Sequence, residues 1–158
     1  MSTLIAYASK YGFTKACAER LAKQLDEKVD IMDLNSQRPN LALYDKVIVG
    51  GSIYAGRIRK PTARFCSENL NILKGKKLGL FICGMADGND ALKQLESAFP
   101  KELLSAAIAK ESFGGEYDFS KMNFLERFII KKISGSDKNQ SRMMEESIAR
   151  FAVQINNA

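Results

Sequence analysis

Five short strand-like runs, separated by stretches with helical periodicity, constrain the fold of this chain more than any other feature of its sequence. Short runs rich in Val, Ile and Leu are typical of strands buried on both faces, and an intervening helix lets successive strands run parallel. The five expected strands lie at residues 3–8, 29–34, 46–52, 76–83 and 106–113. We therefore expect an α/β fold, in which a doubly wound five-stranded parallel sheet forms the middle of three layers.

The patterning of individual runs predicts their places in the sheet. Residues 29–34 alternate apolar and polar side chains, which indicates a half-buried edge strand, whereas the β-branched run at 46–52 indicates a central strand. Gly114 and Gly115 are expected to close the fifth strand. Helices are expected at 17–25, 61–70, 91–99 and 124–133, with a last helix from 136 through 155, and residues 71–77 are expected to form a connection.

Length and composition exclude several classes of protein. A chain of 158 residues fits one domain, and we expect a single domain over residues 1–158. The sequence has no histidine, which excludes Ser-His-Asp and Cys-His centres and any His-ligated metal. Three cysteines without a C-x-x-C spacing predict neither a disulfide framework nor a thiolate metal site. We expect no metal, and no residue is identified as catalytic.

The charge balance favours anionic partners. Twenty-four Lys and Arg residues against 18 Asp and Glu leave a net charge of +6. Nucleic acid, anionic lipid and acidic protein all fit such a charge, which by itself does not choose among them. The apolar runs are too short for a signal peptide or a membrane span, so we expect a cytoplasmic protein.

Residues 9–14, with the sequence Ser-Lys-Tyr-Gly-Phe-Thr, join the first expected strand to the first helix. The hydroxyl groups of Ser9 and Thr14, with Gly12 between them, can surround a small anion while backbone N–H groups and the positive end of the helix point at it. This anion loop fits a phosphate. A simple helix N-cap by Ser9 or Thr14 is the open alternative.

Two further loops follow the third and fourth expected strands, at residues 52–57 and 84–89. If a helix follows every strand, all three loops lie at the carboxyl edge of the sheet, where open α/β sheets bind ligands. The single glycine of the anion loop does not match G-x-G-x-x-G, which disfavours NAD binding, and no G-x-x-x-x-G-K-[ST] motif is present for a nucleotide triphosphatase.

The S-x-x-G-x-T anion loop, the Gly-Ser-Ile-Tyr-Ala-Gly loop at 51–56 and their order along the chain resemble the flavodoxin-like family, which binds FMN. Within that family, residues 51–57 and 126–135 look most like the bacterial flavodoxin-type, menaquinone-linked protoporphyrinogen oxidases. The resemblance implies a flavodoxin-like fold, FMN as the cofactor, and electron transfer through the flavin. Two redox functions stay open, an electron carrier and a protoporphyrinogen oxidase of haem biosynthesis; a non-redox phosphate-binding or interaction module is a further alternative.

The resemblance also implies which residues bind FMN, in three loops. The phosphate loop comprises Ser9, Lys10, Tyr11, Gly12, Phe13 and Thr14. The loop along one face and edge of the flavin ring comprises Ser52, Ile53, Tyr54, Ala55 and Gly56. The loop on the other side comprises Cys83, Gly84, Met85, Asp87 and Gly88. Tyr54 is the expected stacking partner of the ring.

The resemblance and the basic residues of the sequence also suggest partners. The resemblance implies a redox partner protein or a quinone, and no nucleic acid. A basic cluster follows the second loop and forms either a solvated face or a clamp for carboxylates such as porphyrin propionates: Arg57, Arg59, Lys60 and Arg64. Residues 123–134 form either a sheet-covering helix or a helix in peripheral contact with a membrane.

Overall fold

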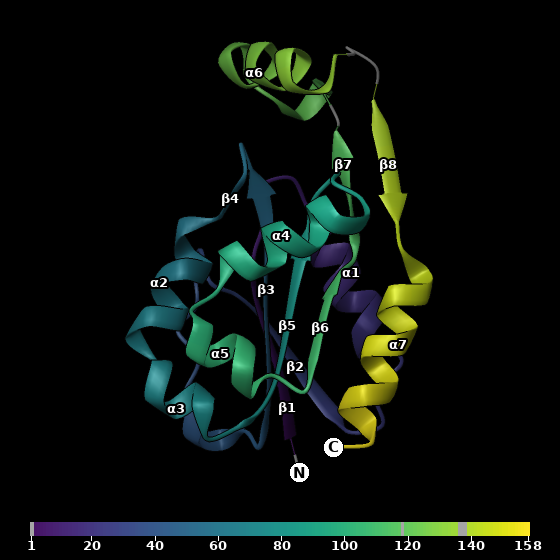
Figure 1. The fold of residues 1–158 in the computed structure, drawn as a ribbon. Coiled ribbons are helices and arrows are strands. Elements are labelled where there is room, and N and C mark those ends of the chain that lie inside the picture. Colours follow the sequence, from purple (N-terminus) through teal and green to yellow (C-terminus); the bar gives the residue numbers. More distant parts are fainter. Residues whose placement is uncertain (1, 118, 136–138) are drawn as a thin grey trace.

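A computed structural model describes residues 2–117, 119–135 and 139–158. Five parallel strands follow the order β2-β1-β3-β5-β6 across the main sheet (Figure 1). Their bounds are Ser2–Ala8 (β1), Lys28–Asp33 (β2), Lys46–Tyr54 (β3), Lys77–Cys83 (β5) and Ala109–Ser112 (β6). The predicted α/β fold is confirmed, as are the edge position of β2 and the central position of β3.

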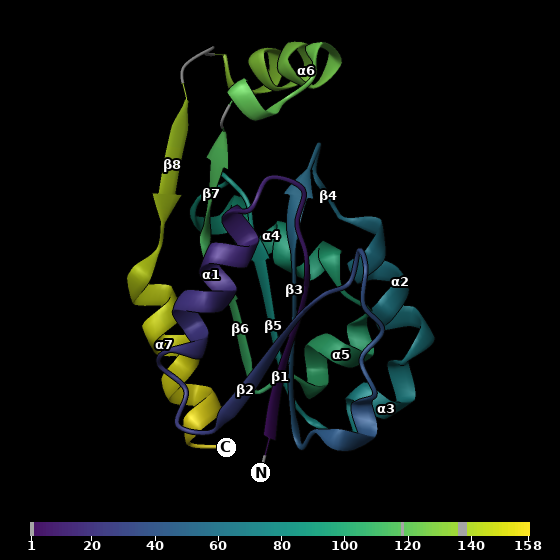
Figure 2. The ribbon, with the colours of Figure 1, turned by 180° about the vertical axis from the view of Figure 1, so that it is seen from behind.

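Helices cover both faces of this sheet (Figure 2). One face packs against α1 (Phe13–Ala22) and α7 (Glu145–Asn156). The other packs against α2 (Lys60–Glu68), α3 (Leu70–Lys74), α4 (Gly88–Ala98) and α5 (Lys101–Ala106). The prediction of a connection at 71–77 was therefore wrong for its first residues, because a helix as short as α3 carries too few turns for its periodicity to be recognised.

Three aromatic rings pack together in the core beneath α7. Phe81 of β5 stacks on Phe113 at a centroid distance of 4.6 Å, and Phe151 of α7 meets both rings edge-on. All three side chains are completely buried. The Phe81 ring occupies the space in which a Cβ on Gly50 of the neighbouring strand would lie. Glycine at this position therefore allows an aromatic ring to pack flat against the sheet.

Strand β3 continues past the parallel sheet into a hairpin. The two-residue strand β4 (Arg57–Ile58) pairs antiparallel with the end of β3. The turn between them places Ala55 at φ 50° and Gly56 at φ 79°. A positive φ is costly for alanine, so this turn holds its backbone in a strained conformation beside the sheet edge.

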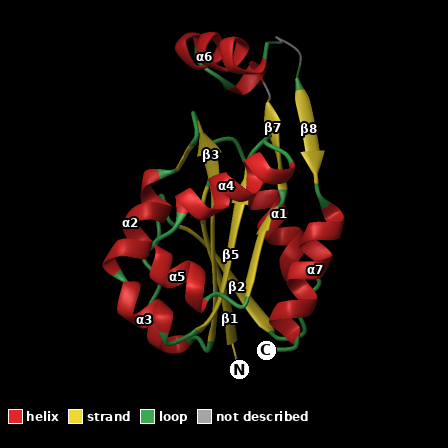
Figure 3. Cartoon of the chain, in the orientation of Figure 1, coloured by secondary structure: helices red, strands yellow, loops and turns green. Residues whose placement is uncertain are grey.

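A separate two-stranded ribbon extends beyond the sheet (Figure 3). It consists of β7 (Gly114–Tyr117) and β8 (Gln140–Met143), paired antiparallel, with a single helical turn at Phe119–Lys121 and helix α6 (Phe124–Ser134) between them. Gly114 has φ 89°, and a Cβ there would overlap the Arg142 carbonyl oxygen. Gly114 and Gly115 thus begin a new strand instead of ending the fifth one.

The expected last helix also needs correction. Its predicted start at 136–137 lies outside the described residues, and 140–143 form strand β8 instead of helix. Helix α7 begins at Glu145. In the described residues, no helix combines the length and the apolar character that crossing a membrane requires.

Candidate functional site

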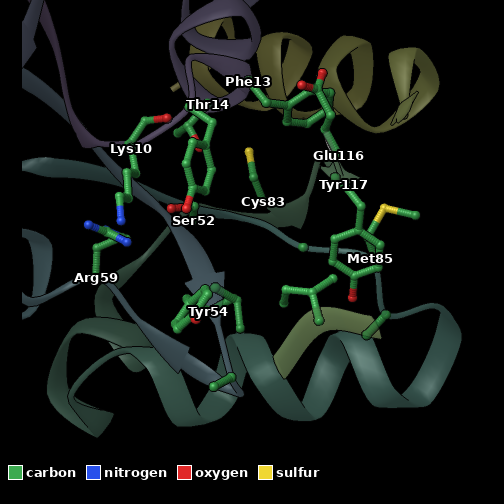
Figure 4. Close-up of a pocket in the computed structure, with 18 of the residues that line it drawn as sticks. Lys10, Phe13, Thr14, Ser52, Tyr54, Arg59, Cys83, Met85, Glu116 and Tyr117 are labelled. Atoms are coloured by element: carbon green, nitrogen blue, oxygen red, sulfur yellow. The ribbon is translucent and has the colours of Figure 1, made fainter. Parts of the chain in front are cut away.

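A cavity of about 630 Å³ opens at the carboxyl ends of β1, β3 and β5 (Figure 4). The chain winds from β1 to β2 in one direction and from β3 through β5 to β6 in the other, so the cavity lies at the switch point between β1 and β3. Thirteen of the predicted site residues line it: Ser9, Lys10, Tyr11, Phe13, Thr14, Ser52, Ile53, Tyr54, Ala55, Gly56, Cys83, Gly84 and Met85.

Three predicted site residues lie outside the cavity lining. Gly12 is the N-cap of α1 at φ 96°, where an L side chain would be strained. Asp87 forms an ion pair with Arg142 of β8. Gly88 is the first residue of α4 and has φ 53°. Gly12 and Gly88 thus shape the backbone next to the cavity, and the Asp87 carboxylate is bound to the ribbon.

Three buried polar atoms at the cavity, two of them in the anion loop, have no hydrogen-bond partner among the described residues. Thr14 is completely buried, and its Oγ1 has no hydrogen-bond partner in the described part of the chain. Tyr11 and Gln94, on α4, are half-buried, but the Tyr11 hydroxyl and Gln94 Oε1 are themselves buried and also lack a partner. All three residues line the cavity. Because an unpaired buried polar group costs about 1–3 kcal/mol, three of them around one cavity indicate a polar ligand.

The helix end itself is open to such a ligand. The N-cap of α1 is Gly12, which has no side chain to bond to the free N–H groups, and the first turn contains no acidic residue. Ser9 Oγ accepts a hydrogen bond from the Gly12 N–H at 3.2 Å. The alternative of an N-cap by Ser9 or Thr14 is therefore wrong, and the positive end of α1 is available to an anion.

Three tyrosines gather at the cavity. Tyr11, Tyr54 and Tyr117 pack against a small apolar cluster of Phe119, Met122 and Ile130. Tyr54 reaches the cavity from the end of β3 and Tyr117 from β7 (Figure 4). Burial raises the pKa of the Tyr117 phenol above its usual range, so this ring is uncharged at neutral pH. Flat aromatic rings from different elements suit a flat, partly apolar ligand.

Helix α6 is tied to the anion loop by an ion pair. Lys10 Nζ lies 2.8 Å from Glu126 Oε1, and the Glu126 side chain is only 10% exposed. Glu126 also forms a capping box with Asn123 at the start of α6. Ile130 and Ile133, on the same helix, line the cavity. The inward face of α6 therefore covers part of the site.

The basic cluster divides between the cavity and the surface. Arg59 lines the cavity, whereas Arg57, Lys60 and Arg64 do not. Figure 4 shows the charged groups of Arg59 and Lys10 on the same side of the cavity. Arg59 is thus the member of the predicted cluster that is placed to meet a bound ligand.

Cys83, which lines the cavity, forms a buried thiol pair with Cys17. A hydrogen bond with Cys83, followed by burial, raises the pKa of the Cys17 thiol far above its usual range. Both side chains are almost completely buried and neither forms a disulfide. Cys17 therefore stays protonated, and it contributes no reactive thiolate next to the cavity.

Sequence reasoning missed the residues that the ribbon and nearby helices bring to the cavity: Ala86, Asp90, Gln94, Gly115, Glu116, Tyr117, Met122, Ile130 and Ile133. Of these, Glu116 and Tyr117 had the clearest signal. They directly follow the Gly114-Gly115 pair, which the sequence predicts to close the fifth strand. Glu116 is bonded within the ribbon, accepting from Ser141 Oγ at 3.3 Å and pairing with Lys121 at 3.4 Å.

Comparison with known proteins identifies the family. The model of the flavodoxin domain family matches residues 4–144. No curated protein matches the chain. Among solved structures, an archaeal flavodoxin is 15% identical to this chain, with a TM-score of 0.59. The match covers 99% of this chain and 97% of the flavodoxin. Oxidised flavodoxin 1 from Bacillus cereus has 13% identity and a TM-score of 0.60, covering 99% and 98%.

A flavoprotein from Lactobacillus acidophilus, solved in complex with FMN, has 15% identity and a TM-score of 0.51 and covers 70% of this chain and 92% of its own. At these identities the likeness of the solved structures shows the fold. The family model spans most of the chain, from β1 to the residue before α7. The chain therefore belongs to the flavodoxin domain family.

Proposed function

We propose that this protein binds FMN non-covalently in the cavity and carries electrons between redox partners. The observation that carries the proposal is the convergence of Tyr11, Thr14 and Gln94, with their unpaired buried polar atoms, on one cavity at the switch point of the sheet. The Lactobacillus acidophilus relative, which was solved with FMN, supports the choice of ligand. Bound FMN supplies one- and two-electron redox chemistry that no side chain of the cavity can perform.

The residues of the cavity fit the two ends of FMN. Thr14 Oγ1 and the free N–H groups at the start of α1 suit the phosphate, because they are donors at a positive helix end. Tyr54 and Tyr117 suit the flat ring and keep water from it. Gln94 Oε1, an acceptor, suits an N–H group of the ring. The inward face of α6 covers the site from outside the sheet.

Titration with FMN and with riboflavin tests this proposal. We expect FMN to bind with quenching of its fluorescence, and riboflavin, which lacks the phosphate, to bind at least about tenfold more weakly. Equal affinities would show that the anion loop does not bind the phosphate. If the protein binds neither compound, the alternative of a non-redox phosphate-binding or interaction module is favoured.

A second candidate function is the oxidation of protoporphyrinogen, with a quinone as the acceptor of its electrons and protons. The specific observation in its favour is Arg59, whose guanidinium lines the cavity and has the geometry to bind a propionate carboxylate through two hydrogen bonds. The carrier is preferred because it requires only the cofactor site, whereas the oxidase also requires a porphyrinogen to reach the flavin.

An anaerobic assay separates the two functions. FMN-loaded protein is given protoporphyrinogen and a menaquinone analogue, and the rate is compared with that of the quinone alone. For the oxidase, we expect flavin-dependent turnover that falls about tenfold in Arg59→Gln, through the loss of a charge-assisted contact. The control Arg64→Gln, outside the cavity, should keep the rate. If turnover is no faster than with quinone alone, the oxidase is excluded and the electron carrier remains the proposed function.

A further inference from the structure

The outward face of α6 carries a cluster of exposed apolar side chains. Ten large apolar side chains are exposed in the described part of the chain, and four of them belong to this helix of 11 residues. Three of the four form the outward face: Phe124 is 87% exposed, Leu125 65% and Phe128 58%. The fourth, Ile133, is 59% exposed but lies on the side of α6 that lines the cavity. The other six are spread over separate elements. Single exposed apolar residues are ordinary on soluble proteins, whereas a cluster of this kind indicates an interaction surface.

Basic side chains surround these apolar residues. Arg127, Lys131 and Lys132 lie on α6 and are exposed. The Lys132 ammonium lies 5.9 Å from the centre of the Phe128 ring. A groove of about 340 Å³ is lined by Phe119, Phe124, Arg127, Phe128 and Lys131. The surface therefore combines aromatic and aliphatic groups with cations at their edge.

The acidic residue of α6 is turned away from this surface. Glu126 is the one acid in the helix, and its carboxylate is buried against Lys10 on the inward side. Every exposed charge on α6 is therefore positive, which agrees with the net charge of +6 of the whole chain. Such a face is complementary to an anionic surface that also accepts apolar side chains.

The position of the helix fits a planar partner. Figures 1 and 2 show α6 lying across the end of the molecule, beyond the sheet edge, so that its long side faces outward. An interfacial helix lies in the plane of a bilayer, with its aromatic and aliphatic side chains among the acyl chains and its Lys and Arg side chains at the headgroups.

We infer that α6 docks the protein onto an anionic phospholipid surface, through Phe124, Leu125 and Phe128 and the cations beside them. This role is independent of the flavin. Because Ile130 and Ile133 line the cavity from the inward side of the same helix, docking holds the cavity close to the membrane, with α6 between them.

Flotation with lipid vesicles tests this inference on the full chain. We expect binding to mixed phosphatidylcholine and phosphatidylglycerol vesicles, weaker binding to pure phosphatidylcholine vesicles, and release from the mixed vesicles at high salt. The double variant Phe124→Ser, Phe128→Ser should bind the mixed vesicles at least about tenfold more weakly, because two apolar anchors are removed. The matched control is Leu92→Ser, Val153→Ser, which removes two exposed apolar residues of α4 and α7 and should bind like the native chain.

A second pair of variants tests the charge. Arg127→Gln, Lys132→Gln should weaken binding to the mixed vesicles about tenfold. The control double variant, Lys23→Gln with Lys93→Gln, lowers the net charge by the same two units but changes exposed lysines away from α6. It should keep most of the binding. Circular dichroism of each variant checks that it is folded. Equal loss in both charge pairs would show that net charge, not α6, attracts the protein, and would overturn the inference.

A spectroscopic probe reports on α6 directly. The chain has no tryptophan, so Phe128→Trp introduces a single indole at the proposed contact. We expect its emission to shift to the blue when mixed vesicles are added, and that of the control Leu92→Trp to stay unchanged. No shift at position 128, or a concentration-dependent dimer that forms through this face without vesicle binding, would assign the surface to another role and overturn the inference.

Discussion

Replacing Thr14 by Val lowers the affinity for FMN by about 10- to 100-fold and leaves the affinity for riboflavin nearly unchanged, because the lost hydroxyl is a donor to the phosphate. Valine has nearly the same shape, so the buried site keeps its packing. The Thr14 hydroxyl has no hydrogen-bond partner among the described residues, so we expect its removal to cost the unliganded protein no hydrogen bond. Stability without ligand should therefore stay constant or rise. Fluorescence titration and urea unfolding measure the two effects.

Thr62 offers a matched control for this substitution. It is also completely buried, but its Oγ1 donates a hydrogen bond to the Gly50 carbonyl oxygen at 3.0 Å. Thr62→Val should therefore lower the free energy of unfolding by about 1–3 kcal/mol and leave the FMN affinity unchanged. If Thr14→Val instead destabilises the unliganded protein and binds FMN normally, the Thr14 hydroxyl has a structural role and the assignment of the phosphate site is wrong.

Replacing Gly50 by Ala should lower the free energy of unfolding by about 3 kcal/mol, near the upper end of the usual cost of overpacking. A methyl group at this position would overlap the ring of Phe81, which cannot move away because it is stacked on Phe113 and enclosed by Phe151. Urea unfolding, followed by circular dichroism, measures the loss.

Two further variants isolate the cause of that loss. Gly75→Ala is the control, since its added carbon would meet only the Ile72 carbonyl oxygen, at 3.5 Å, and it should change the stability by less than about 0.5 kcal/mol. Phe81→Leu removes ring atoms from the overlap and should therefore be less costly in the Gly50→Ala background than in the native chain. Additive effects in this double-mutant cycle would mean that the ring is not what excludes the methyl group.

Much of the fold could be predicted because its signals are local. Runs of β-branched residues identify buried strands, and helical periodicity between them identifies crossovers, which together require a parallel sheet. The same logic located the anion loop and the two loops at the carboxyl edge, since the end of each strand determines where the next loop lies. The resemblance to the flavodoxin-like family implied the individual residues of these loops, and thirteen of the sixteen lie around one cavity.

The ribbon could not be predicted in this way. Strand β8 reads Gln-Ser-Arg-Met and has no apolar alternation, and it exists because it pairs with β7, as in the register Gly114↔Met143. Such pairing joins residues that are distant in the sequence, and nothing local to either strand indicates it. Tyr117, Glu116 and the inward face of α6 reach the cavity only through this pairing.

The sequence by itself therefore determined the parallel sheet, the order of its strands along the chain and the edge at which a ligand would bind, because these follow from the periodicity of neighbouring residues. The tertiary structure alone decided which polar atoms are left without partners, such as Thr14 Oγ1, and which charges are paired, such as Lys10 with Glu126. It also decided which face of α6 turns outward. Burial and pairing depend on what the rest of the chain places against a residue, and local sequence does not contain that information.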